Sequence, residues 1–248
     1  MIIFQNLSWY KTEYLSQEWK KEESLHYTFY FKKESLAEQD IKDIIVLKED
    51  HHSKITQWLG VNNSKKINYY LYPSLKEKVT LMGDNSPGNA IWQELDANIN
   101  PKKFEIHTIY NEKCKFIGEH EDTHLLSLPW GVSIYLFCEG LAQYLENNFM
   151  GEDLNVVAKK LLQKNKLYSI EWLCTNDNWG NIEPVIFYPQ AGSFTKYIIE
   201  TYGKEKFSEL YRNTSRNYDT SKNLLGVEKI YQKKINQLEK EWLEYISK

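Results

Sequence analysis

The hydrophobic periodicity changes near Tyr110, and this change limits the fold more than any other feature of the sequence. Before it, short aromatic runs with alternating spacing are typical of strands and flank one long stretch with helical spacing. After it, apolar residues recur every three or four positions, which indicates helices. We therefore expect an α+β protein: a small mixed β-sheet lobe with helices, residues 1–112, followed by a mainly helical lobe, residues 113–248.

Turn and helix-breaking residues set the boundaries of the expected elements. Gly60 closes the long helix of the first part, residues 83–89 are rich in turn residues, and Pro129 with Gly131 separates two helices of the second part. The expected strands cover residues 26–31, 67–73 and 104–110, and the expected helices cover residues 35–60, 114–127, 132–149, 193–203 and 227–246.

Charge and composition exclude several functional classes. The chain has 31 basic and 34 acidic residues, mixed along its length, so we expect no nucleic-acid partner. Its apolar runs are shorter than the roughly 18 residues of a transmembrane helix. The first residues do not resemble a secretory signal, so we expect a cytoplasmic protein, or a secreted one whose leader has been replaced. The three scattered cysteines predict free thiols rather than a disulfide framework.

The segment HEDTH, residues 120–124, carries the strongest chemical signal. His120 and His124 are one helical turn apart, so both rings leave the same helix face and can reach one ion. Glu121 lies about 100° around the axis, beside the pair, where its carboxylate can take a proton from a metal-bound water. Neutral imidazoles suit Zn²⁺. The alternative is that both histidines are solvated or hydrogen-bonded helix residues.

A catalytic zinc needs a third protein ligand, and the next expected helix offers Glu139. Glu139 begins the run EGLAQYLE and follows His124 after fourteen intervening residues. The break at 129–131 allows the second helix to fold back against the first. Glu146, seven residues further along the same face, is the alternative ligand.

HEDTH followed by an EGLAQY helix resembles the gluzincin zinc metallopeptidases, and residues 188–212 and 225–246 are similar to the C-terminal part of a peptidase MA-like family in that group. The resemblance covers roughly residues 24–246. It implies a zincin-like fold with an active-site cleft between the two lobes and a peptide or protein substrate. It also implies that His120, His124 and Glu139 bind zinc and that Glu121 is the general base.

One position departs from the thermolysin-like pattern. That pattern has an Asp four residues after the ligand Glu, to orient a zinc-bound imidazole, and this chain has Gln143 there. An amide oxygen can accept the imidazole N–H but polarises the ring less than a carboxylate does. The spacing from His124 to Glu139 is also shorter than in thermolysin.

Two further site residues are expected from the same resemblance. Tyr188 is the candidate donor to the oxyanion that forms during peptide hydrolysis. Residues 104–110 would form an edge strand that binds the substrate backbone by β-addition, with His107 near the site. For both side chains, ordinary packing is the alternative.

Three functions are compatible with these residues. The leading hypothesis is a zinc-dependent peptidase in which Glu121 deprotonates the attacking water. The second is a catalytically inactive, peptidase-like binding or regulatory module, which the Gln143 departure motivates. The third is hydrolysis of a small amide or ester, because the same site chemistry serves these reactions.

Overall fold

The computed structural model describes residues 19–92 and 103–248, which form two compact units. The first unit is Met1–Leu126 and the second is Ser127–Lys248. The boundary thus lies after the HEDTH helix α4 (His120–Leu126), later than the expected boundary at residue 112, and the sheet unit carries both histidines. The expected α+β class with a mixed sheet is confirmed.

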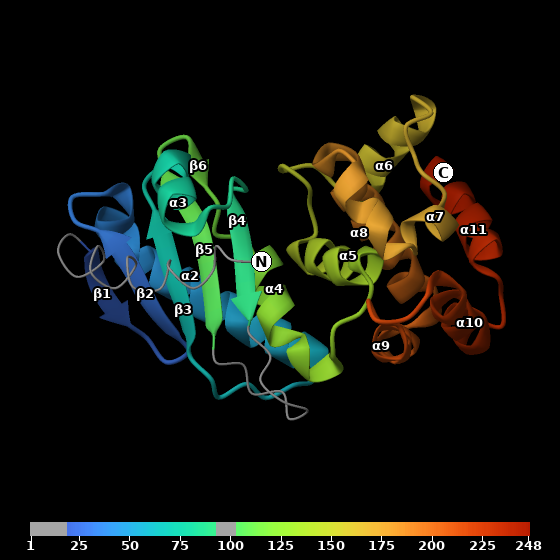
Figure 1. The fold of residues 1–248 in the computed structure, drawn as a ribbon, viewed down its shortest axis with the longest axis horizontal. Helices are drawn as coiled ribbons and strands as arrows, with labels where there is room; N and C mark the ends of the chain where they lie inside the picture. The colour runs from blue at the N-terminus through green and yellow to red at the C-terminus, as the bar shows by residue number, and fades with distance from the viewer. Residues whose placement is uncertain (1–18, 93–102) are drawn as a thin grey trace. The chain divides into compact units, whose positions relative to one another are not determined.

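The first unit is built on a mixed sheet (Figure 1). The strand order is β1-β2-β3-β5-β4, in which β2, β3 and β5 are parallel while β1 and β4 run antiparallel to their neighbours. The short β6 pairs with the end of β5. The strands are β1 (Trp19–Glu23), β2 (Tyr27–Lys32), β3 (Ile67–Tyr72), β4 (Gly88–Trp92), β5 (Phe104–Asn111) and β6 (Cys114–Lys115).

Helices cover both faces of this sheet. Consecutive strand residues point to opposite sides, so each face carries side chains that a helix can pack against. Tyr69 faces the long helix α2 (Leu36–Leu59), where the Lys48 ammonium lies 4.9 Å from its ring centre. Tyr70 faces the other way and packs in a core cluster with Leu81 of α3 (Leu75–Met82). In Figure 1, α2 lies behind the sheet and α3 in front of it.

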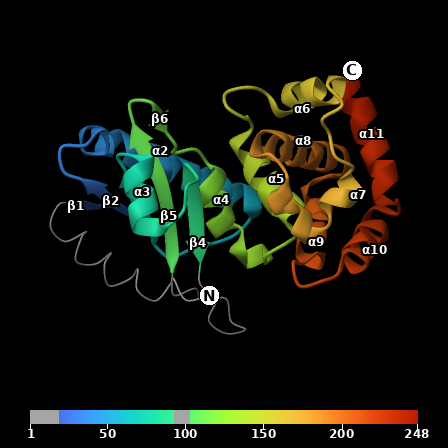
Figure 2. The same cartoon turned by 45° about the horizontal axis from the view of Figure 1, so that its top comes forward.

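The second unit is entirely helical among the elements that the structure describes, except for one isolated bridge. Helices α5 and α8 lie side by side in both views (Figures 1 and 2). The core contains Phe194 and Trp242, whose rings meet edge to face while the indole N–H donates to Ser193 Oγ at 3.0 Å. The α-helices are α5 (Tyr135–Glu146), α6 (Leu154–Gln163), α7 (Ile170–Leu173), α8 (Pro184–Tyr202), α9 (Lys204–Asn213), α10 (Thr220–Tyr231) and α11 (Ile235–Ser247), and two short 3₁₀ helices are η1 (Leu128–Trp130) and η2 (Asn176–Asn181).

Several expected element boundaries were wrong. Strand β4 begins at Gly88, inside the expected loop 83–89, and the expected helix 114–127 contains β6 before α4 begins. Helix α8 starts at residue 184 and continues through Pro189, although only residues 193–203 were expected. The last expected helix is two helices, because Gln232 takes a left-handed conformation with φ 55° between them.

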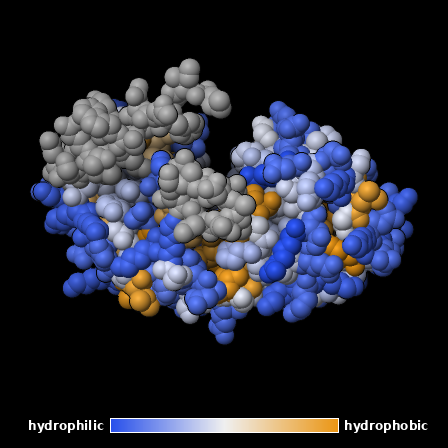
Figure 3. All heavy atoms as spheres, turned by 60° about the horizontal axis from the view of Figure 1, so that its bottom comes forward, coloured by the Kyte–Doolittle hydropathy of each residue, from blue (hydrophilic) through white to orange (hydrophobic). Residues whose placement is uncertain are grey.

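The surface carries mainly polar side chains with separate apolar spots. On the face shown in Figure 3, orange residues form small patches among blue and white ones. Large exposed apolar side chains such as Leu25, Met150 and Leu225 come from distant parts of the sequence. Within residues 19–92 and 103–248, no helix has both the length and the apolar character needed to cross a membrane.

Candidate metal centre

The two histidines of HEDTH lie at opposite ends of one turn of α4. The first helical hydrogen bond runs from Thr123 N to Glu119 O at 2.9 Å, so the helix starts at His120 itself. The His120 and His124 rings meet edge to face, with their centres 5.0 Å apart. His120 is buried and His124 is half-buried. The prediction that both rings leave the same face of one helix is confirmed.

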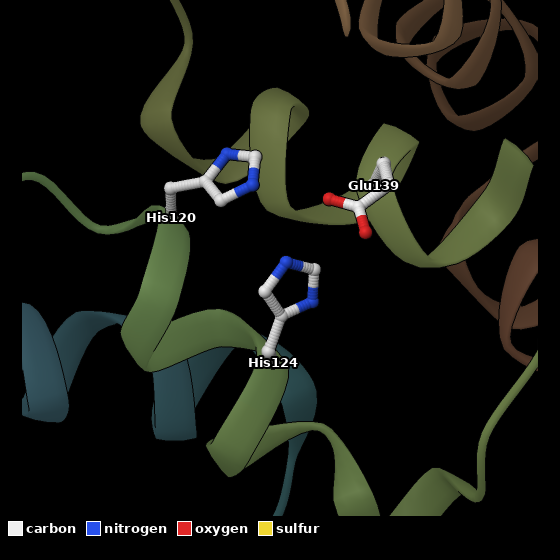
Figure 4. A group of neighbouring side chains, drawn as sticks. All are labelled: His120, His124 and Glu139. Atoms are coloured by element: carbon white, nitrogen blue, oxygen red, sulfur yellow. The ribbon is translucent and has the colours of Figure 1, made fainter. Parts of the chain in front are cut away.

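Glu139 completes a group of three possible metal ligands. One nitrogen from each of His120 and His124 and one carboxylate oxygen of Glu139 all lie within 4.8 Å of one another. Figure 4 shows the two rings on α4 and the carboxylate on α5 pointing toward one another. Among the described residues, this is the one such group of His, Cys, Asp or Glu side chains. The group could therefore bind a metal ion, and two imidazoles with one carboxylate are a donor set that zinc prefers.

The position of Glu139 depends on the close approach of α5 to α8. A Cβ atom on the next residue, Gly140, would lie 2.2 Å from Thr195 Oγ1 and 2.8 Å from the Ala191 carbonyl oxygen. Only glycine therefore fits where the two helices cross. One turn further along, Gly192 of α8 similarly accommodates the side chain of Gln143. The glycine of EGLA thus has a packing role that spacing alone did not reveal.

Gln143 makes its hydrogen bonds at the end of its own helix. Its amide nitrogen donates to the Asn148 carbonyl oxygen and, at 3.2 Å, to Glu146 Oε2. These bonds fix the amide group and do not test its expected contact with a zinc-bound imidazole. They also tie Glu146 to Gln143, and the described ligand group contains Glu139 rather than Glu146.

Glu121 lies against strand β4, which is the end strand of the sheet. Its side chain is buried, and its Oε1 is 3.0 Å from the position that a Cβ on Gly88 would take. The Phe116 ring would be even closer to that Cβ, at 2.3 Å, so Gly88 permits the contact between strand and helix. The expected base therefore lies beside the last strand of the sheet that residues 19–92 and 103–248 form.

The expectation that residues 104–110 form an edge strand was wrong. Strand β5 pairs with β3 on one side and β4 on the other, so that His107 faces Tyr70 in one pairing and Asn89 in the other. The His107 side chain is fully buried, with its Nδ1 3.0 Å from Tyr72 Oη and its Nε2 3.1 Å from Glu105 Oε2. Its ring stacks on Tyr70 with centres 4.5 Å apart. Contacts within the sheet account for His107.

Tyr188 lies in α8 and is half-buried, with its ring edge to face against Phe187 at 5.7 Å. These contacts do not test its expected role toward an oxyanion, which stays a prediction.

A buried ion pair behind α4 was not found from the sequence. Lys48 of α2 bonds Asp122, the third residue of HEDTH, and neither side chain has any exposed surface. Two sequence features could have suggested this ion pair: Lys48 lies on the apolar face of a predicted helix, and HEDTH has an acidic residue at its centre. Because 74 positions separate the two residues, no local pattern joins them.

Comparison with solved structures supports the fold. The chain is similar to an M1 zinc metallopeptidase from Deinococcus radiodurans, seen in its E323A mutant, with a TM-score of 0.50 and 14% identity over 91% of this chain and 51% of that chain. A second structure of the M1 zinc metallopeptidase from that organism matches with a TM-score of 0.46, again at 14% identity and with the same coverage. This chain spans about half the length of these structures. No family model matches the sequence, and no curated protein matches it. The similarity supports the expected zincin-like fold.

Proposed function

We propose that this protein is a zinc-dependent peptidase. The observation that carries the proposal is the convergence of two imidazole nitrogens and one carboxylate oxygen within 4.8 Å. His120, His124 and Glu139 would hold the ion, and Glu121 on the same helix would be the base. The zinc metallopeptidase activity named for the Deinococcus proteins is consistent with this assignment.

The chemistry divides between the metal and the protein. Bound zinc would polarise the substrate carbonyl and lower the pKa of a water molecule toward about 7. Glu121 would then accept the proton of the attacking water at a carboxylate oxygen and deliver it to the leaving amine nitrogen. Burial of this carboxylate against β4 leaves it few solvent contacts, which favours proton exchange with a bound substrate.

Strand β4 suits the binding of an extended peptide. Among the described residues it is the end strand of the sheet, and no described strand pairs with its outer side, where an extended peptide could add a further strand. A peptide paired with Gly88–Trp92 would run past Glu121, because α4 packs on this strand. We assign the role first expected of residues 104–110 to β4. Tyr188 remains the proposed oxyanion donor.

Four proteins test the proposal: wild type, Glu121→Gln, Glu139→Gln and the matched control Glu146→Gln, which lies on the same helix as Glu139. After zinc loading and dialysis, we expect one zinc per chain in all but Glu139→Gln. Cleavage of a mixed peptide library should be chelator-sensitive in wild type. It should fall by about 10²–10⁴-fold in Glu121→Gln, the usual contribution of a general base.

The results also separate the alternative, an inactive binding module. Gln143 motivates that alternative, because the carboxylate of the thermolysin-like pattern is missing at this position. Chelator-sensitive cleavage of a single library peptide would exclude it. Zinc binding without any cleavage would favour it, and wild-type protein without zinc would refute the zinc-dependent peptidase.

A further inference from the structure

The HEDTH helix is too short to fix its own orientation. Helix α4 has seven residues, and isolated helices of this length are unstable in water. Contacts with the rest of the first unit must therefore set its rotation and its position along the axis. Asp122 lies about 200° around the axis from each histidine, so its side chain points to the opposite side, into the unit.

Two side chains from distant parts of the chain meet at Asp122. Tyr27 of β2 donates from its hydroxyl to Asp122 Oδ1 at 2.7 Å, and Lys48 of α2 donates to Oδ2. Burial raises the pKa of the Tyr27 phenol, and the adjacent Asp122 carboxylate raises it further, so the phenol stays protonated and donates. Each carboxylate oxygen thus has its own buried donor, from a strand on one side and a helix on the other.

Lys48 also holds the chain segment that enters α4. Its ammonium donates to the Gly118 carbonyl oxygen at 3.0 Å, two residues before His120, in addition to the Asp122 carboxylate. The ammonium also lies 4.9 Å from the centre of the Tyr69 ring. One buried cation therefore links the entry and the middle of the HEDTH turn to α2, which restrains both the rotation and the axial position of α4.

We propose that Lys48, Asp122 and Tyr27 form a positioning cluster that orients α4 and, through it, His120 and His124 toward a metal ion. The proposal rests on the zinc site proposed above. Buried ion pairs contribute little net stability compared with apolar residues of similar size, whereas a polar network can select one arrangement. The cluster is thus expected to affect metal binding more than it affects unfolding.

The main test variant is the double substitution Lys48→Met with Asp122→Leu, which removes both charges and keeps the volume similar. Zinc affinity, measured against a chromophoric chelator, should fall by 10–100-fold, as is usual when groups that orient metal ligands are lost. The urea unfolding midpoint should stay close to that of wild type. The absorption spectrum of bound Co²⁺ should change, because the ligand geometry changes.

Lys78→Met is the matched control, since Lys78 is the other fully buried lysine among the described residues and lies on the opposite face of the sheet in α3. It also bonds an aspartate, Asp84, which is not part of α4. Its zinc affinity and Co²⁺ spectrum should match those of wild type. Zinc affinity that is unchanged in the double variant, with an unchanged spectrum, would overturn the proposal.

Two further measurements keep the test decisive. If the double variant does not fold, Tyr27→Phe removes one hydrogen bond to Asp122 and should lower zinc affinity by about threefold or more. Hydrogen exchange on the metal-free proteins should be faster at the α4 amides in the cluster variants than in Lys78→Met. If wild type binds no zinc, the proposed function fails, and equal exchange at α4 would refute the cluster's role independently.

Discussion

Substitution of Gly140 by alanine tests whether the α5–α8 crossing sets the position of Glu139. The new Cβ would lie 2.2 Å from Thr195 Oγ1 and 2.8 Å from the Ala191 carbonyl oxygen. Overpacking of this kind costs about 1–3 kcal/mol, and a clash with backbone cannot be relieved by a change of rotamer, so we take about 3 kcal/mol. Alanine recovers about 1 kcal/mol of helix propensity. The expected net loss of stability is about 2 kcal/mol.

Gly226→Ala is the matched control for this prediction. Gly226 also lies inside a helix, α10, but its new Cβ would meet Asn213 O at 3.4 Å and nothing closer. This variant should gain up to about 1 kcal/mol from helix propensity. The two variants should therefore differ by about 3 kcal/mol, or roughly 10 °C in melting temperature for a unit of this size.

Thermal and urea unfolding followed by circular dichroism would measure this difference. Adding Thr195→Ala to Gly140→Ala removes the shorter contact and leaves the backbone contact, so it should restore only part of the loss. Zinc affinity should fall with Gly140→Ala, because the neighbouring Glu139 moves with the helix. If Gly140→Ala is as stable as Gly226→Ala, the two helices are not in the tight contact from which this argument starts.

Three further predictions concern protons and metal. Burial lowers the pKa of His51 and His52 from the usual 6.5 to about 4. As the pH falls, these histidines therefore bind protons in the unfolded chain before they do so in the folded protein. The free energy of unfolding should decrease between about pH 6.5 and 4. A constant urea midpoint over this pH range would contradict this prediction. Burial raises the pKa of Glu241, but hydrogen bonds, chiefly from Lys233, lower it to about 2. At pH 7, Glu241→Gln should therefore lower the free energy of unfolding in urea by about 1 kcal/mol. An unchanged free energy of unfolding would refute this prediction. Zinc at 100 times its Kd should stabilise wild type by about 2.7 kcal/mol, and equal stabilisation of Glu139→Gln would exclude that ligand.

The sequence predicted those elements whose signals are local. Helix α2 shows its apolar spacing together with both caps: Ser35 Oγ accepts from the Glu38 amide, and Gly60 ends the helix with φ 67°. Strands β2, β3 and β5 are short runs rich in aromatic residues, and a helix would not place these side chains on a single face. In these cases propensity, pattern and capping agree, and the structure follows them within a few residues.

The elements that were missed depend on distant partners. Strand β4 starts in a segment rich in turn residues, and its strand conformation comes from pairing with β5. Helix α8 continues through Pro189 because the helix is packed on several sides, and this packing outweighs one lost hydrogen bond. At the candidate site, the spacing of His120 and His124 in the sequence was enough to predict that both rings share one helix face. The contact between β4 and α4, and the pairing of Lys48 with Asp122, depend on the tertiary fold.

Residues of the HEDTH turn with different proposed roles point to different sides of one short helix: the metal ligands, the general base and the residue that positions the helix. His120 and His124 share one side of α4, Glu121 points to β4, and Asp122 points into the unit toward α2. Successive helical residues differ by about 100°, so the two acids cannot exchange roles without rotating the histidines away from their face. Glu121→Gln should therefore reduce turnover and leave zinc bound, whereas Asp122→Asn should weaken zinc binding first. Equal losses of zinc in both variants would mean that the two carboxylates are not separated in this way.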